Sequence, residues 1–253
     1  MPDLRIRPLN MGVLMGLRKT NFLLNRAHSE TVDAPCIAWL VHGASSTILV
    51  DAGPCDAATA ATHYQRTLRR TAEQEPAAAM RMGGIAPADV DLVILTHLHW
   101  DHSYNLELMT KATILVQEAE VRYAMHPLPT DFRTYGRGTV GFRPGWLASY
   151  DRFRLVGGDL DVLPGVGVYL LPGHTPGCQG VGVETRAGTY LIAGDNVPLY
   201  ENWAGDEQLK RIPSGLHVDL EAYFRSFEKM ERIARHILPS HDPRVLEHEL
   251  YPF

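Results

Sequence analysis

A dense group of potential metal ligands lies near position 100. The segment 97–102 reads HLHWDH and combines three imidazoles with one carboxylate: His97, His99, His102 and Asp101. Imidazole nitrogens and carboxylate oxygens bind zinc and related divalent ions. In an extended segment His97, His99 and Asp101 share one side of the chain, whereas a turn brings His102 toward a second ion. The segment therefore predicts a metal centre that needs further ligands from elsewhere.

Three further candidate ligands follow short apolar runs later in the chain. They are His174 in LPGHTPG, Asp195 in LIAGD and His241 in ILPSHD. Residues at the end of a buried strand emerge at the sheet edge, where loops build functional sites on a rigid scaffold. A single histidine in a turn is more often structural than a ligand. Three strand-end positions together with the first cluster favour one shared two-metal site.

The motifs HLHWDH, PGHTPG, AGD and PSHD occur in this order within residues 37–242, and the ordered set resembles the metallo-β-lactamase superfamily of hydrolases. The resemblance implies an α/β fold, a four-layer αββα sandwich of two mixed sheets flanked by helices, with the metals at their shared edge. It also implies that the seven candidates form two triads joined by one bridging carboxylate: His97, His99 and His174; Asp101, His102 and His241; and the bridging Asp195.

Particular positions distinguish branches of this superfamily. Asp195 stands where the two-zinc lactamases carry cysteine, and His99 stands where flavodiiron proteins carry glutamate, so neither branch fits. The TILVDAG segment and the late SHD resemble those of N-acyl homoserine lactonases and relatives such as pyridoxolactone hydrolase. The resemblance also implies that Asp51 of TILVDAG supports the metal ligands. One position departs from the lactonases, which carry a tyrosine three residues after the bridging aspartate. Here that position is Pro198, and Tyr200 follows two residues later.

The resemblance implies the opening of a lactone, an N-acyl homoserine lactone or a related ring ester, by a hydroxide that bridges two divalent ions. One ion is expected to stabilise the oxyanion. Asp101 and Asp195 are the expected catalytic carboxylates, with Asp195 passing the proton of the attacking water to the leaving alkoxide. Zinc is the expected metal, although iron, manganese and cobalt suit the same ligands. A thiolesterase of the glyoxalase II type and an iron-dependent redox enzyme of the same fold are the alternative functions.

Aromatic residues next to the ligands are the candidates for substrate binding: Trp100, Tyr104, Tyr200 and Trp203. The stretch 127–153 has several glycines, prolines and aromatics without clear periodicity, so we expect an active-site cap loop there. An aromatic wall favours an apolar or ring-bearing substrate. No serine nucleophile is needed, and we expect Ser103 and Ser240 to support neighbouring ligands.

Short β-branched runs bounded by Gly, Pro and Asp predict seven strands, over residues 37–41, 47–50, 91–95, 113–116, 166–171, 189–193 and 237–238. Helices are predicted over 56–74, capped by Asp56, and over 118–125 and 220–235. The last helix carries an apolar stripe that we expect in the core: Leu220, Phe224, Phe227, Met230 and Ile233. Strands mixed with helices indicate a layered α/β fold, and the absence of a linker favours a single domain over 1–253.

The charge balance argues against nucleic acid as a partner. Among 253 residues, 24 are Lys or Arg and 29 are Asp or Glu, which leaves a net charge of -5 and no surplus to neutralise a phosphate backbone. Arg66, Arg69 and Arg70 have helical spacing and are expected on a solvated helix face. The expected partner is therefore a small-molecule substrate.

Membrane insertion and export are not expected either. No apolar run approaches the roughly 18–20 residues of a spanning helix. The first twenty residues place arginines among apolar positions, unlike a secretory signal. Cys36, Cys55 and Cys178 are widely spaced and odd in number, which indicates reduced thiols and a cytoplasmic protein.

Overall fold

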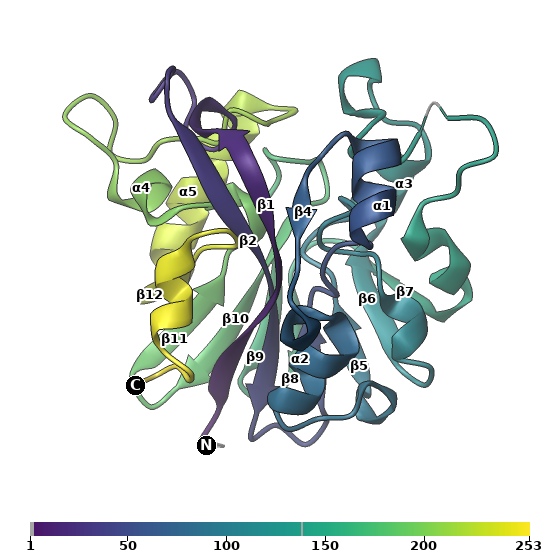
Figure 1. Cartoon of the computed structure of the whole chain (residues 1–253). Helices are drawn as coiled ribbons and strands as arrows, with labels where there is room; N and C mark the ends of the chain where they lie inside the picture. Colours follow the sequence, from purple (N-terminus) through teal and green to yellow (C-terminus); the bar gives the residue numbers. More distant parts are fainter. Residues whose placement is uncertain (1–2, 138) are drawn as a thin grey trace.

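The computed structural model describes residues 3–137 and 139–253 and arranges twelve strands in two sheets (Figure 1). The larger sheet has the order β4-β1-β2-β3-β5-β6-β7, with β1 Arg5–Arg18, β2 Thr31–His42, β3 Ile48–Val50, β4 Leu68–Arg69, β5 Leu92–Ile94, β6 Thr113–Gln117 and β7 Phe153–Val156. The smaller sheet has the order β12-β11-β10-β9-β8, with β8 Leu160–Leu163, β9 Val166–Leu170, β10 Gln179–Thr185, β11 Gly188–Ile192 and β12 His236–Leu238. Both sheets are mixed, because β3, β5, β6 and β7 run parallel in the first and β11 and β12 run parallel in the second.

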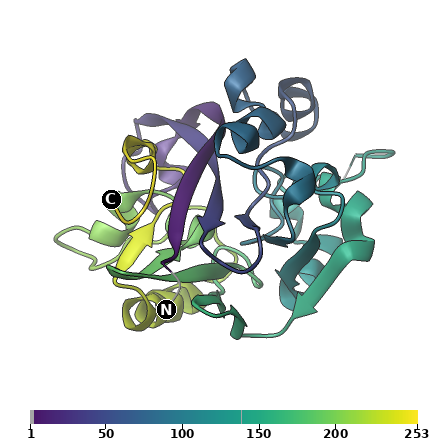
Figure 2. The ribbon, with the colours of Figure 1, turned by 90° about the horizontal axis from the view of Figure 1, so that it is seen from below.

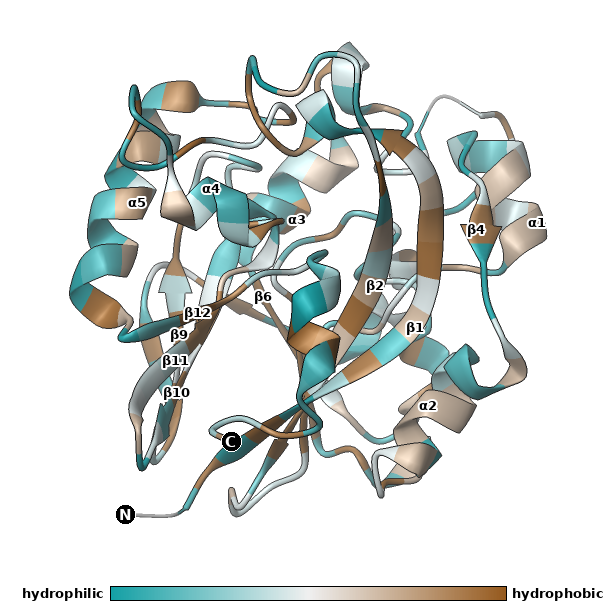
Figure 3. Ribbon diagram, turned by 60° about the vertical axis from the view of Figure 1, so that its left-hand side comes forward, coloured by the Kyte–Doolittle hydropathy of each residue, from teal (hydrophilic) through white to brown (hydrophobic). Residues whose placement is uncertain are grey.

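Apolar side chains from both sheets form the central core. Alternate residues of β2 divide between two clusters: Ile37, Trp39 and Val41 pack with strands of the smaller sheet, and Ala38 and Leu40 pack with the outer helices. This division follows from the two-residue period of a strand. A strand buried on both faces is thus placed between two layers. Figure 3 shows a different pattern along β1, where apolar and polar residues alternate.

Helices cover the two outer faces, as Figure 2 shows from below. The helices are α1 Ala57–Thr59, α2 Pro76–Met82, α3 Glu118–Met125, α4 Tyr200–Ala204 and α5 Leu220–Ile233. Helices α2 and α3 contribute buried residues to the outer face of the larger sheet, and α5 contributes Phe227 and Met230 to that of the smaller sheet. The predicted four-layer αββα sandwich is therefore confirmed. No helix in the described part of the chain is long and apolar enough to cross a membrane.

The predicted helix over 56–74 is wrong beyond its first turns. Asp56 does cap α1, accepting a hydrogen bond from the Thr59 amide, but the helix ends after a wider π turn at Gln65, which has φ +52°. The chain then forms β4, because Leu68 pairs with Leu14 of β1. Pairing with a strand that is distant in the sequence therefore overrides the local helix propensity. Helix α2 follows, in a region where no helix was predicted.

Two smaller predictions also need correction. In α5, the predicted core positions Phe227 and Met230 are buried and Ile233 packs against them, but Leu220 and Phe224 are exposed, and Tyr223 is buried instead. Arg70 does not lie on a solvated helix face. Its side chain is only 6% exposed and donates hydrogen bonds to three backbone carbonyls, those of Met11, Pro54 and Cys55.

Candidate metal centre

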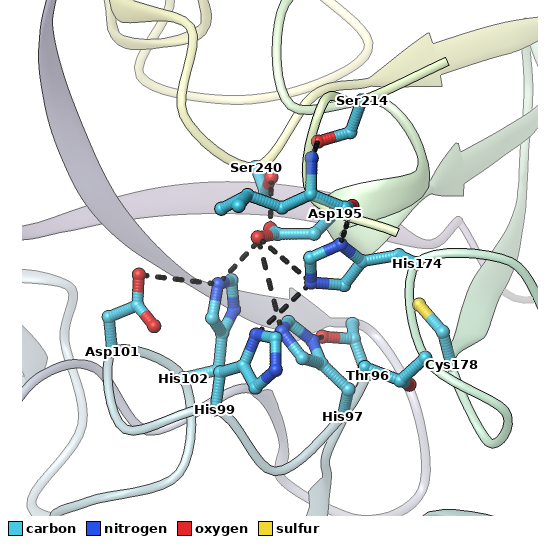
Figure 4. A network of polar contacts seen from close by, with 12 residues as sticks. Thr96, His97, His99, Asp101, His102, His174, Cys178, Asp195, Ser214 and Ser240 are labelled. Atoms are coloured by element: carbon cyan, nitrogen blue, oxygen red, sulfur yellow. Dashed lines mark hydrogen bonds and ion pairs between the residues drawn. The ribbon is translucent and has the colours of Figure 1, made fainter. Parts of the chain in front are cut away.

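The seven predicted ligands converge at one edge shared by the two sheets, and Figure 4 labels all of them except His241. The segment 97–102 follows β5 of the larger sheet. The other three ligands follow strands of the smaller sheet, with His174 after β9, Asp195 after β11 and His241 after β12. Donor atoms of His97, His99, His174 and Asp195 lie within 4.8 Å of one another, as do those of His102, Asp195 and His241. The structure thus brings together all the residues that the motifs singled out.

Asp195 lies between the two imidazole groups and belongs to both. Its Oδ2 is 3.9 Å from His97 Nε2 and 3.5 Å from His174 Nε2. Its Oδ1 is 3.2 Å from both His102 Nε2 and His241 Nε2. Each carboxylate oxygen therefore faces a different group, which is the geometry that a bridging ligand needs.

Asp101 completes the second group from the opposite side. Its Oδ2 lies 3.9 Å from His102 Nε2 and 3.8 Å from His241 Nε2. The buried thiol of Cys36, on β2, is also within 4.8 Å of Asp101 and His241, a neighbour that sequence analysis missed. Burial and the nearby carboxylates raise the pKa of this thiol well above its ordinary value in the metal-free chain.

Four of the five imidazoles have their outer nitrogen held by a hydrogen bond. His97 Nδ1 contacts Thr96 Oγ1 at 3.0 Å, and His102 Nδ1 contacts Asp51 Oδ2 at 2.8 Å. His174 Nδ1 contacts the Leu216 carbonyl at 2.8 Å, and His241 Nδ1 contacts the Pro35 carbonyl at 2.9 Å. An Nδ1–H that donates outward leaves the Nε2 lone pair facing inward. These contacts therefore orient the rings for ligation.

Asp51 holds two of the ligand-bearing segments together. Its carboxylate accepts hydrogen bonds from the Thr96 amide at 2.8 Å and the Thr96 hydroxyl at 2.9 Å, in addition to His102. The residue follows β3 and has φ +59°, a left-handed conformation uncommon outside glycine. This placement fits the supporting role that the motif resemblance implied.

The donor set fits divalent cations. The buried Nε2 of His97 has no hydrogen-bond partner among the described residues, and His99 Nδ1 lies 3.1 Å from His174 Nε2. Burial lowers the pKa of both His97 and His99 well below the ordinary value, so both rings are neutral and offer lone pairs. Neutral imidazoles that face one another and a carboxylate are the donors that a zinc-like ion requires.

Carboxylates dominate the electrostatics of the second group. Burial disfavours charge on His102 and His241, but Asp195 outweighs it and raises the pKa of both imidazoles. The same two rings hold the pKa of Asp195 well below its ordinary range, although burial opposes this. In the metal-free chain, protons on these rings balance the carboxylates, and a bound metal would displace them.

A buried carboxylate behind the centre joins three segments. Glu120 of α3 accepts hydrogen bonds from the Leu98 amide at 2.9 Å, the Thr175 hydroxyl at 2.5 Å and the Tyr135 hydroxyl at 2.7 Å. It thereby links two ligand loops to the 127–153 stretch. Sequence analysis missed Glu120, because nothing in its local pattern distinguishes it from a surface residue of an amphipathic helix.

The two serines support neighbouring groups, as expected. Ser240 donates to Asp195 Oδ1 at 2.7 Å. Ser103 donates to the carbonyls of Leu98 and His99.

A cavity of about 710 Å³ opens beside His99 and His174. Its walls come from the turn after α1, from residues 129–139 within the predicted cap, and from residues 215–217. Part of the 127–153 stretch therefore borders the cavity. However, its Tyr135 and Trp146 are each only 1% exposed, so the stretch is anchored in the core and is not a free loop.

None of the four predicted substrate-binding aromatics borders this cavity. Trp100 stacks on Tyr64, with ring centroids 4.5 Å apart, and Tyr104 packs in the same apolar cluster. Tyr200 and Trp203 lie under the guanidinium groups of Arg244 and Arg211, at 4.8 and 4.0 Å from the ring centroids. Tyr200 as a replacement for the tyrosine absent at Pro198 stays a prediction.

The expected aromatic wall is also absent from this cavity. Phe132 is the only Phe, Tyr or Trp among its described lining residues, and polar and basic side chains make up most of the rest.

A family comparison agrees with this geometry. The model of the metallo-beta-lactamase superfamily matches residues 32–241, which is most of the chain. The chain belongs to the metallo-β-lactamase superfamily. The predicted family is thus confirmed, and with it the class of metal-dependent hydrolase. The match spans all seven converging ligands, from the segment after β5 to His241.

Similar proteins include several N-acyl homoserine lactonases. An N-acyl homoserine lactonase from a Bacillus species is 26% identical over 186 residues, covering 70% of each protein. The N-acyl homoserine lactonase AttM of Azorhizobium caulinodans is 27% identical over 265 residues, covering 96% of this chain and 95% of its own. A solved N-acyl homoserine lactone hydrolase, with N-hexanoyl-L-homoserine at its catalytic metal centre, superposes with a TM-score of 0.80 at 21% identity, covering 100% of this chain and 99% of that one.

Proposed function

We propose that this protein opens lactone rings by hydrolysis, acting on an N-acyl homoserine lactone or a related ring ester with the help of two divalent metal ions, zinc foremost. The observation that carries the proposal is the position of Asp195, whose two oxygens face two separate groups of imidazoles. The lactonases among its relatives support the substrate class.

The residues of the proposed site divide into two metal-holding sets. His97, His99 and His174 would hold one ion, Asp101, His102 and His241 would hold the other, and Asp195 would belong to both. Ions bound there would activate water near neutral pH and stabilise negative charge that develops on the ester carbonyl oxygen.

The protein's own contribution to the reaction is orientation and proton transfer. The Ser240 hydroxyl holds Asp195 Oδ1, while Oδ2 has no hydrogen-bond donor among the described residues. Oδ2 is therefore the atom to which we assign the proton of the attacking water. That water forms a new bond to the carbonyl carbon, the ring C–O bond breaks, and the proton passes from Asp195 to the leaving alkoxide.

A substrate panel on metal-replete protein tests the proposal. We expect an N-acyl homoserine lactone to be opened faster than a matched thiolester or phosphodiester, with the released acid followed by a pH indicator. The His97→Ala and Asp195→Asn variants should lose at least about 100-fold in kcat, which corresponds to about 2.7 kcal/mol. His28→Ala, at an exposed histidine that does not line the cavity, is the matched control.

Two outcomes of this panel would contradict the proposal. Faster thiolester cleavage would indicate an enzyme of the glyoxalase II type. A redox-dependent spectrum of iron-loaded protein without hydrolysis would indicate a redox enzyme of the same fold.

A further inference from the structure

The cavity beside the candidate metal centre is strongly basic. Three arginines line it: Arg66 from the turn after α1, and Arg133 and Arg137 from the stretch 129–139. His63 and His217 add two further cationic or neutral groups, and Asp131 is the only acidic lining residue in the described part of the chain. This concentration of positive charge contrasts with the net charge of -5 of the whole protein.

These arginines have no carboxylate partner in the described part of the chain, although Arg66 Nη1 donates a hydrogen bond to the Gln65 carbonyl at 3.3 Å. Within the part of the chain that the structure describes, none of the three guanidinium groups lies within ion-pair distance of a carboxylate, whereas Arg26 and Arg70 each pair with one. The one acidic side chain nearby is engaged elsewhere, because Asp131 Oδ2 accepts a hydrogen bond from the Tyr123 hydroxyl at 2.5 Å. Arg66 and Arg137 are half-buried, so their charges are less screened than those of fully exposed side chains.

Their location makes an anion the natural partner. The metal ion that His99 and His174 would help to hold would add positive charge to the same cavity, and like charges in a half-enclosed space repel. A guanidinium group presents paired N–H donors that match the oxygens of a carboxylate or phosphate. His99, His174 and the three arginines line the same cavity, so a substrate reaching from the metals would contact the guanidinium groups.

We propose that Arg66, Arg133 and Arg137 bind an anionic group, a carboxylate or a phosphate, on the part of the substrate remote from the scissile ester. This inference rests on the proposed lactone hydrolysis and specifies its substrate class. A substrate with an anionic group thus replaces the apolar or ring-bearing substrate that we expected from an aromatic wall. The favoured lactone thus carries a negatively charged tail.

Lactones that differ only at the end of the acyl chain test this assignment. We would compare N-acyl homoserine lactones of equal chain length that end in a methyl group, a carboxylate or a phosphate. The ratio of kcat/KM for each charged lactone over the methyl lactone should be about tenfold or more at low salt, and should fall as salt is added. The carboxylate and phosphate arms show which anion fits better.

Variants locate the effect in the cavity. Arg137→Gln and the double variant Arg66→Gln, Arg133→Gln should bring the charged-to-methyl ratio toward one. Arg143→Gln removes an exposed arginine of the same stretch that does not line the cavity, and should leave the ratio as in the wild type. A methyl lactone preferred over both charged ones, or a ratio that the cavity variants leave unchanged, would overturn the inference while lactone hydrolysis stands.

A binding measurement keeps the inference testable without turnover. If none of the lactones is hydrolysed, the proposed function fails, and calorimetry with the three ring-opened acids on zinc-loaded protein still tests the arginines. Tighter binding of the acids with charged tails, weakened by Arg137→Gln, supports the anion site. Equal binding of all three acids contradicts it.

Discussion

At the scale of single residues, the ligands are selected and oriented by contacts outside the centre. His102 faces Asp195 because Asp51 holds its other nitrogen, and Asp51 is itself fixed by the Thr96 amide and hydroxyl. These seven ligands were predictable because each lies in a short motif after an apolar run. Cys36 and Glu120 were not, since distant strands and helices bring them in without a local signal.

The contacts of Asp51 lead to a prediction for metal affinity. Asp51→Asn replaces a carboxylate oxygen that accepts from His102 with an amide that cannot satisfy all three donors. We expect zinc affinity to fall 10–100-fold, the usual cost of losing a group that orients a ligand, as measured by competition with a chelating dye. Asp89→Asn, at an exposed aspartate, serves as the control. Wild-type affinity in Asp51→Asn would remove the supporting role.

At the scale of elements, apolar strands were predictable and interrupted ones were not. The runs that became β3, β5, β6 and β11 are short, β-branched and buried. In contrast, β1 is the longest strand, yet its pairing with β2 is irregular between Asn10 and Val13 and between Leu14 and Leu17. Gly12 and Gly16 have positive φ angles there, so bulges break the alternation that would have signalled a strand.

Arg70 shows how a side chain can hold such irregular elements together. Arg70→Met removes the donors to the carbonyls of Met11, Pro54 and Cys55, of which Pro54 alone keeps a second side-chain donor, the Asn105 amide. We expect a loss of about 2–3 kcal/mol in unfolding free energy, measured by urea denaturation of the metal-loaded protein. Arg69→Met, on the exposed neighbour, should change it by less than about 0.5 kcal/mol. Equal effects of the two variants would contradict this account.

At the scale of the whole molecule, the centre exists because two sheets meet. Asp101 follows a strand of the larger sheet and His241 a strand of the smaller one, yet their side chains lie 3.8 Å apart. The ordered motifs and their family resemblance made this convergence predictable from the sequence alone. The cationic cavity was not predictable, because its arginines come from a segment predicted as helix and from an aperiodic stretch. The single domain over 1–253 stays a prediction.

Folding stability should respond to pH in opposite ways with and without metal. In metal-free protein, His102 and His241 have raised pKa values, so their stabilisation is fully present below about pH 6.5 and is lost as pH rises through the folded-state pKa. Zinc binds the deprotonated rings, so its stabilisation grows with pH. The difference in Tm between zinc-loaded and chelator-treated protein should therefore widen from pH 6 to pH 9. A narrowing difference would contradict the assignment of these rings.

The central claim is that the seven converging residues hold two metal ions on which lactone hydrolysis depends. Zinc titration of chelator-treated protein, with lactone turnover followed at each addition, tests it most directly. We predict that activity appears on titration and reaches a plateau at about two ions per chain, and that it is lost in the double variant His97→Ala, Asp195→Asn. Fewer than about one bound ion per chain after full supplementation, or wild-type turnover by the double variant, would contradict the claim.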